Sequence, residues 1–86
     1  MEIQYLPSFR RAFRKLSQED QDRVEQALWM FKMNPFDSRL RNHKLTGSKE
    51  GTRSISAAYD LRILYIEKDG HAIIIVVAVG KHDDVY

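Results

Sequence analysis

The sequence contains no cysteine among its 86 residues, and only two prolines and four glycines. The lack of cysteine excludes a disulfide framework, a thiol nucleophile and a zinc–thiolate site. Long apolar runs are also missing, because the longest, Ala72–Val79, falls far short of the ~20 residues that cross a bilayer. The first residues do not read as a secretory signal. We therefore expect a single cytoplasmic domain, residues 1–86, that is held together by packing alone.

A large excess of one charge is absent as well. Fourteen basic and twelve acidic residues leave a net charge of +2, which argues against a histone-like polycation. The distribution is nevertheless uneven, since residues 38–62 hold six basic side chains and two acidic ones, a local charge of +4. The basic residues are Arg39, Arg41, Lys44, Lys49, Arg53 and Arg62. Such a band suits phosphate binding, and a solvated rim of lysine and arginine is the alternative interpretation.

Two amphipathic helices are predicted in the first part of the chain. Pro7 suits the first turn of a helix. Apolar residues recur at about helical spacing from there, at Leu6, Phe9, Phe13 and Leu16. Ser17 is a candidate N-cap of a second helix, and Pro35 disfavours helical geometry at Asn34. The buried stripe of that helix should be Val24, Ala27, Leu28 and Phe31. The tight turn between the two predicts a helical hairpin.

Strand patterns cover four segments, Glu2–Leu6, Thr52–Ala57, Leu61–Glu67 and His71–Val79. Asp69 and Gly70 supply a hairpin turn between the last two strands. The order is β-α-α-β-β-β, followed by a short polar tail from Lys81 to Tyr86. We expect an α+β fold in which an antiparallel sheet packs against the helical hairpin.

Histidines are the candidate proton-transfer groups. His71 follows the Asp-Gly turn and is expected to be exposed, whereas His43 and His82 lie just outside strands, where their side chains can converge over one sheet. An imidazole with an ordinary pKa of about 6.5 takes or gives a proton at neutral pH, as RNA transphosphorylation needs at its 2′ and 5′ oxygens. A metal site at Lys81–Asp84 is the weaker alternative, because no complete three-ligand set has helical or strand spacing.

Four segments, in this order and spacing, resemble the RelE/ParE superfamily of bacterial toxin–antitoxin systems. They are His43–Gly47 (HKLTG), Gly51–Arg53 (GTR), Asp60–Tyr65 (DLRILY) and Val79–Tyr86 (VGKHDDVY). Within the superfamily the sequence looks most like the ribosome-dependent mRNA interferases of the YafQ and RelE branches. The resemblance implies a RelE-like fold and a toxin that cleaves mRNA in the ribosomal A site. In such toxins the ribose 2′-OH attacks the neighbouring phosphate, leaving a 2′,3′-cyclic phosphate, and neither a metal nor another cofactor is required.

The resemblance also implies which residues form the site. His43 and His82 match histidines of the YafQ-like site, and Asp60 matches an acidic residue there. Arg62 matches the arginine that contacts the scissile phosphate, and Tyr86 the terminal aromatic on which a base stacks. The basic residues expected to bind RNA are Arg41, Lys44, Lys49, Arg53 and Lys81.

Three positions depart from the YafQ-like pattern. Ser56 stands where that branch has a further histidine, and Leu61 stands where it has an aromatic residue. The arginine that precedes the C-terminal glycine is replaced by Ala78 or Val79. We expect Arg62 to substitute for it.

Two further functions compete with mRNA cleavage. ParE-like members of the superfamily inhibit DNA gyrase by binding and do not cleave RNA, but they generally lack the histidine and terminal-aromatic site. A decayed member that only binds its antitoxin is the other alternative. A cognate antitoxin is the expected partner in every case, with a monomeric free toxin. Trp29, Met30 and Phe36 belong either to its docking surface or to the core, and the core is favoured because Trp29 lies beside the main stripe.

Overall fold

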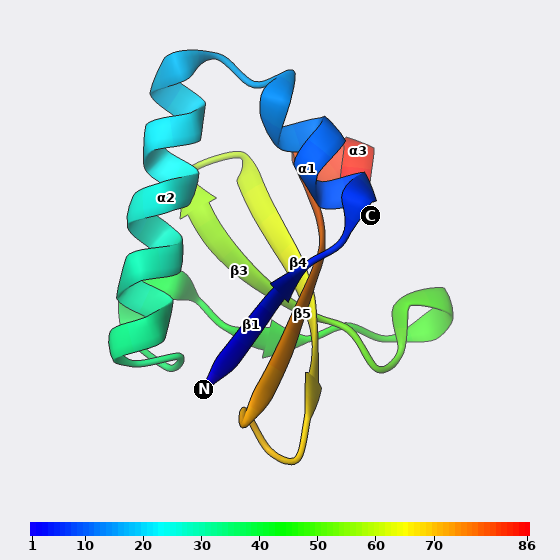
Figure 1. Cartoon of the computed structure of the whole chain (residues 1–86). Coiled ribbons are helices and arrows are strands. Elements are labelled where there is room, and N and C mark those ends of the chain that lie inside the picture. The colour runs from blue at the N-terminus through cyan, green and yellow to red at the C-terminus, as the bar shows by residue number, and fades with distance from the viewer.

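Local signals in the sequence set the ends of the two main helices. The computed structural model describes residues 1–86, with α1 at Pro7–Arg14 and α2 at Gln18–Met33 (Figure 1). Ser17 caps α2, because its Oγ accepts a hydrogen bond from the backbone N–H of Asp20 at 3.1 Å. The helix ends at Asn34, next to a proline, as expected. None of the helices combines the length and the apolar character that a membrane span requires.

The strands form one five-stranded sheet in the order β1-β5-β4-β3-β2. Their bounds are β1 Glu2–Tyr5, β2 His43–Lys44, β3 Arg53–Ala58, β4 Leu61–Lys68 and β5 Ile73–Gly80. Single 3₁₀ turns at Ser38–Leu40 and Gly47–Lys49 flank β2. The hairpin turn between β4 and β5 is confirmed, since Asp69 and Gly70 have φ of 53° and 57°. The predicted α+β fold with helices packed on a sheet is therefore confirmed.

The sheet is mixed, whereas an antiparallel sheet was expected. Strands β2 to β5 are antiparallel neighbours, but β1 pairs parallel to β5, with Glu2 opposite Ile73 and Tyr5 opposite Val76. The alternation of side chains is the same in both kinds of pairing, so the sequence pattern carries no information on direction. As a result β5 is interior, which accounts for its almost continuous apolar sequence.

Helices α1 and α2 cover one face of the sheet. The predicted stripe of α2 is confirmed as buried, and it meets Phe9 of α1 and sheet residues such as Ile55, Ile63 and Ile74 in one core. In α1 the stripe is only partly correct, because Leu6 is 39% exposed. Ile55 and Ile63 point toward the helices, so the residues that alternate with them point the other way.

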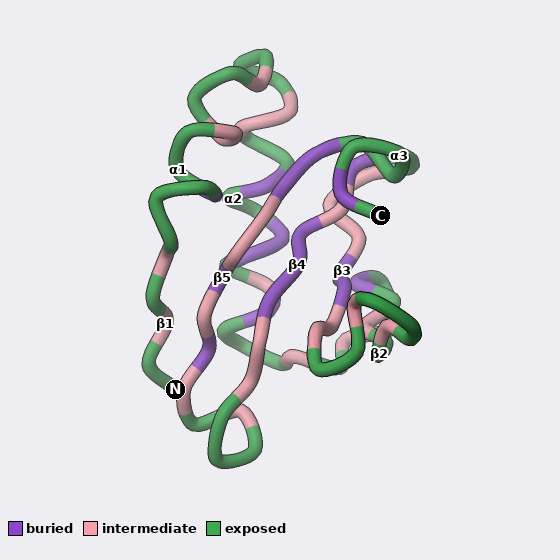
Figure 2. Tube along the Cα trace, turned by 90° about the vertical axis from the view of Figure 1, so that its right-hand side faces the viewer, coloured by how far each residue is buried: buried purple, intermediate pink, exposed green.

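We call this second sheet face, opposite α1 and α2, the open face. It carries Ser54, Ser56, Arg62 and Leu64, which are paired across β3 and β4. The chain end covers part of it (Figure 2). Residues 81–86 were expected to form a polar tail, but a short helix, α3, runs from His82 to Val85 and buries Val85. A sequence window of six polar-rich residues contains too little periodicity to reveal so short a helix.

Gly80 allows α3 to approach the sheet closely. It lies directly opposite Arg62 in the β4–β5 ladder. A Cβ added to Gly80 would lie 3.3 Å from Cγ1 of Val85 and 3.4 Å from Cβ of Asp84. The glycine at the end of β5 is therefore what lets the polypeptide turn back and set His82 beside the open face.

Candidate functional site

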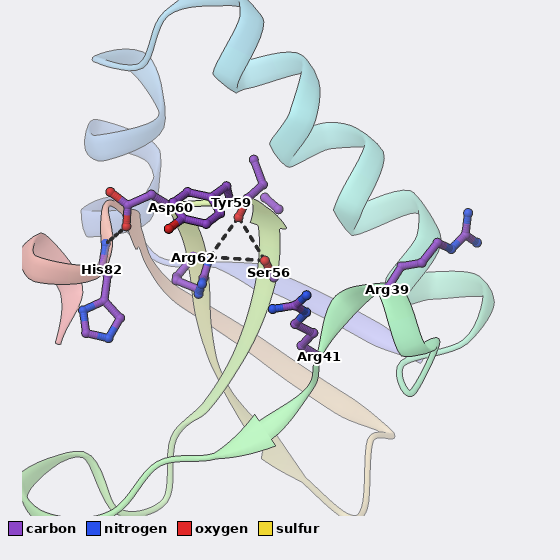
Figure 3. Close-up of a pocket in the computed structure, with 9 residues that line it drawn as sticks. Arg39, Arg41, Ser56, Tyr59, Asp60, Arg62 and His82 are labelled. Carbon is purple, nitrogen blue, oxygen red and sulfur yellow. Dashed lines mark hydrogen bonds between the residues drawn. The ribbon is translucent and has the colours of Figure 1, made fainter.

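The open face bears a cleft of about 430 Å³ where three separate segments meet. The 3₁₀ turn before β2 contributes Arg39 and Arg41, the β3–β4 hairpin contributes Ser56, Tyr59, Asp60 and Arg62, and α3 contributes His82 (Figure 3). Three arginines and a histidine face a single carboxylate, so the cleft is cationic. A cationic cleft of this size suits an anionic group such as a phosphate.

Arg62 is fixed at the cleft by oxygens that carry no net charge. Its Nη1 donates hydrogen bonds to the carbonyl of Ala58 at 2.8 Å, the hydroxyl of Ser56 at 3.2 Å and the carbonyl of Leu61 at 3.3 Å. No carboxylate pairs with it, and its Nε and Nη2 make no hydrogen bond. The guanidinium is thus held rigidly while two of its nitrogens remain available to an anion.

The other two arginines of the cleft differ in how far their charge is already compensated. Arg39 donates to both carboxylate oxygens of Asp37, at 3.0 and 2.8 Å. This hydrogen bonding lowers the pKa of the Asp37 carboxyl to about 2, so the pair stays ionised. Arg41 has no such partner, and its backbone adopts a left-handed φ of 51°. Arg41 and Arg62 are consequently the two uncompensated cations of the cleft.

Asp60 links the hairpin to α3. Its Oδ1 accepts a hydrogen bond from the backbone N–H of His82 at 3.3 Å (Figure 3). The carboxylate therefore fixes the start of α3, and with it the histidine, against the β3–β4 turn. The structure brings Asp60, Arg62 and His82 together, as the sequence predicts, and adds a positioning contact for Asp60.

His82 and Tyr86 form one unit with Ser54. Their rings are in edge-to-face contact, with centroids 4.3 Å apart, and the Tyr86 hydroxyl is hydrogen-bonded to Oγ of Ser54. Ser54 is fully buried, so this contact ties the last residue to the middle of the sheet. The His82 ring is exposed and has only a long contact, 3.4 Å, from Nδ1 to Oδ1 of Asp83.

His43 lies on the open face but outside the cleft lining. It pairs with Ser54 across the β2–β3 ladder, and its Nδ1 lies 2.9 Å from the carbonyl of Arg41. A carbonyl only accepts, so Nδ1 carries the proton and Nε2 of the neutral ring is free as an acceptor. Since Ser54 precedes Ser56 by two residues on β3, His43 is about 7 Å along the strand from the cleft.

The remaining residues predicted to bind RNA do not join the cleft. Lys44 and Arg53 are paired on the helix side of the sheet, where Nε of Arg53 donates to Oδ1 of Asn42 at 2.9 Å. Lys49 lies in the Gly47–Lys49 turn, and Lys81 is exposed just before α3. Alternation along β2 and β3 separates the side chains of Lys44 and Arg53 from the cleft.

His71 is partly buried, in contrast to the exposure that was expected. Its Nε2 is 2.9 Å from the Tyr65 hydroxyl and its Nδ1 is 2.6 Å from Oε2 of Glu67. Nδ2 of Asn42 donates to the same hydroxyl at 2.7 Å and to the carbonyl of Pro35 at 2.9 Å. Burial raises the pKa of Tyr65, so the phenol stays protonated. The network anchors Asn42, whose two chain neighbours are Arg41 and His43.

Several residues of the site carry no signal that sequence reasoning detects. Tyr59 lies in a turn and lines the cleft, whereas Ser54 and Asn42 act through Tyr86 and Tyr65, which are far away in the sequence. Arg39 was recognised as part of the basic band but not as a cleft residue. No group of three or more His, Cys, Asp or Glu side chains is arranged to hold a metal ion.

One aromatic cluster is more exposed than expected. Trp29 and Phe36 are 64% and 58% exposed, together with Met33 at 70%. Met30 instead packs against the core. The preference for core was therefore wrong for Trp29, because the stripe through Val24 and Phe31 already fills the interface between α2 and the sheet.

The sequence matches no protein-family model and no curated protein, but solved structures share its fold. YafQ from E. coli superposes with a TM-score of 0.80 at 20% identity, covering 99% of this chain and 97% of that one. A YoeB/ParE toxin from Agrobacterium tumefaciens gives a TM-score of 0.77 at 15% identity, over 95% and 99% of the two chains. A chain of the toxin–antitoxin complex RelBE2 from Mycobacterium tuberculosis gives 0.64 at 23% identity, over 94% and 96%.

These matches span nearly the whole chain. Identities this low establish the architecture and leave the chemistry to the residues of the cleft itself. The fold expected from the sequence is confirmed, and the chain has the RelE-like fold found in YafQ.

Proposed function

We propose that this protein is the toxin of a type II toxin–antitoxin system and acts as a ribosome-dependent mRNA endonuclease. Two lines of reasoning support the proposal. The fold is that of YafQ and of other toxins of the superfamily, and the sequence carries the superfamily's motifs in order. The observation that carries the proposal is the cationic cleft that Arg41, Arg62 and His82 line together.

In this proposal Arg62 and Arg41 bind the scissile phosphate. When the ribose 2′ oxygen attacks phosphorus, the phosphorane gains negative charge, and two guanidinium groups stabilise it more than the ground state, that of Arg62 already held in place by hydrogen bonds. Removing one such donor costs roughly 10²- to 10³-fold in rate in other enzymes. The guanidinium charge is provided by the polypeptide, so the mechanism requires no metal ion or cofactor.

Proton transfer is assigned to His82 and His43. One imidazole takes the proton from the 2′-OH, the new P–O2′ bond forms, and the P–O5′ bond breaks. The other imidazole gives a proton to the departing 5′ oxygen. The products are a 2′,3′-cyclic phosphate and a 5′-OH end. Asp60 holds His82 through its backbone, and Tyr86 supports its ring.

Primer extension in a translating extract tests this proposal. New mRNA 5′ ends should appear only when ribosomes are present, and a kinase should label them without prior phosphatase treatment, since they carry a 5′-OH. His82→Ala should remove the new ends while the circular dichroism spectrum stays that of the wild type. Absence of new ends with the wild-type protein would refute the endonuclease, and unimpaired cleavage by His82→Ala would refute the assigned site.

The gyrase alternative has its own readout. The YoeB/ParE neighbour shares the fold, so the same preparation should be assayed for inhibition of DNA supercoiling. Inhibited supercoiling without mRNA cleavage would favour a ParE-like toxin.

A cognate antitoxin is the proposed partner, because a fold neighbour comes from the toxin–antitoxin complex RelBE2. Coexpression with the antitoxin should neutralise the toxin. The ribosome and its mRNA are the proposed targets of the free toxin.

A further inference from the structure

Apart from the imidazole of His82, Tyr59 is the only aromatic side chain that lines the cationic cleft. It lies at the tip of the β3–β4 hairpin, and it is 97% exposed. Figure 3 shows its ring beside Asp60, at the same end of the cleft as Arg62. Single exposed aromatic residues are common on protein surfaces. Here, however, the ring lies on the rim of a site that already presents two uncompensated cations.

The other three tyrosines are held in place, and Tyr59 is not. Tyr5 packs on Phe9 with ring centroids 5.4 Å apart, and Tyr65 is buried and hydrogen-bonded. Tyr86 is bonded through its hydroxyl to Ser54 and packs edge-to-face on His82. Tyr59 makes neither a ring contact nor a hydrogen bond. Its ring is therefore free to accept a planar ligand.

A nucleotide offers a ligand of the right shape. A phosphate bound by Arg41 and Arg62 carries a ribose and a base, and the ring of Tyr59 lies on the lining of the same cleft. Base–aromatic stacking is tolerant of sequence because every base has a π-face. Tyr86 is less suited to this task, since it does not line the cleft and its ring already contacts His82.

We infer that Tyr59 is the base-stacking platform of the cleft, and that Tyr86 acts as a positioning residue for His82. The inference rests on the proposed function in one respect, that the ligand is single-stranded RNA. It replaces the expectation from the sequence that the terminal aromatic receives the base.

Binding of a short RNA by NMR titration tests the inference without the ribosome. The probe is a single-stranded tetranucleotide with one 2′-deoxyribose at the scissile position, and a second probe is abasic at the nucleotide next to it. Tyr59→Leu keeps an apolar side chain and removes the π-face, so its affinity for the complete probe should fall by about 5- to 150-fold. Tyr59→Phe, which keeps the ring, should restore binding.

The abasic probe separates stacking from a general loss of structure. Wild type and Tyr59→Leu should bind it equally, because no base remains to be stacked. Trp29→Leu removes an exposed aromatic ring on α2, away from the cleft, and should bind both probes like the wild type. Equal binding of the complete probe by wild type and Tyr59→Leu would overturn the inference. So would an equal loss of affinity for both probes in Tyr59→Leu.

The two proposals fail in different ways. Base-dependent binding through Tyr59 without any mRNA cleavage would refute the endonuclease and leave the platform in place. Ribosome-dependent cleavage with no base dependence at Tyr59 would refute the platform and leave the endonuclease.

Discussion

At the scale of single residues, Arg62 shows how a charged side chain is prepared for an anion. One nitrogen of its guanidinium is bound to three uncharged oxygens, and no carboxylate competes for the other two. Arg39, by contrast, already forms an ion pair with Asp37. Two arginines that look alike in the sequence therefore differ in what they offer a ligand.

Arg62→Ala should lower the cleavage rate by at least about 10²-fold, because the phosphorane loses Nε and Nη2 of Arg62 as donors. The protein should remain folded. Arg62→Lys should recover only part of the rate, since an ammonium lacks the planar fork. Primer extension with ribosomes measures the rate, and thermal unfolding checks the fold. Arg11→Ala, on the exposed side of α1, is the matched control and should cleave normally. A cleavage rate within about threefold of the wild type for Arg62→Ala would exclude Arg62 from the site, because the loss of one such donor should slow the reaction by at least about 10²-fold.

At the scale of structural elements, the hydrogen bonds of the Asn42 side chain hold the segment that carries Arg41 and His43. The Asn42 amide is satisfied by Tyr65, Pro35 and Arg53, on the side of the sheet away from the cleft. A left-handed residue next to this anchor turns the chain toward the open face. The polar network around Tyr65 thus supports the site without touching its ligand.

Asn42→Ala should reduce cleavage and also lower the free energy of unfolding by about 1–3 kcal/mol, because it removes one hydrogen-bond partner from the Tyr65 hydroxyl and another from Arg53. The cleavage defect should lie in kcat more than in KM if the anchor orients Arg41 and His43. Tyr65→Phe is the matched variant, since it removes one hydroxyl from the same network. Its unfolding energy should fall by about 0.5–1.5 kcal/mol. Normal kcat in Asn42→Ala would show that the anchor serves stability alone.

Helix α3 is the second element on which the site depends. Gly80→Ala should press on it, because the added Cβ would lie 3.3 Å from Val85 Cγ1, so the Val85 side chain or the helix has to shift by a few tenths of an ångström. We expect a loss of about 1–3 kcal/mol in the free energy of unfolding, typical of overpacking. The cleavage rate should fall by more than the loss of folded protein accounts for, since His82 moves with the helix. Chemical shifts of the His82 ring in the two proteins would reveal the movement, and unchanged shifts with normal cleavage would contradict it.

At the scale of the whole molecule, the charge balance limits how the protein binds RNA. The net charge is only +2, and the cleft has two uncompensated arginines. Two phosphate contacts on a single strand predict a slope of about −1.4 for the logarithm of affinity against the logarithm of salt concentration. Fluorescence titration of a short RNA over a range of salt measures this slope. A slope of about −4 or steeper would show that basic residues outside the cleft also bind phosphates.

The α+β architecture was predictable because it depends on short-range patterns. The serine cap, the proline stop and the Asp-Gly turn act over a few residues and recur in the structure at the expected places. The direction of β1 and the helix at the C-terminus were not predictable. The direction of β1 is set by its pairing with β5, about 70 residues away in the sequence. The C-terminal helix depends on the close approach of its residues to Gly80.

The sequence by itself determined the two main helices, four of the five strands, the buried stripe of α2, and the set of charged and ionisable residues available for chemistry. Only the tertiary structure decided which of them act together. Alternation along β2, β3 and β4 sends Lys44 and Arg53 to one face and Arg62 to the other, and the local +4 band is therefore divided between the two faces. The physical reason is that side-chain direction in a sheet follows from register and pairing, which long-range contacts fix. Basic residues that are close in the sequence form a binding site only where folding brings them to the same surface.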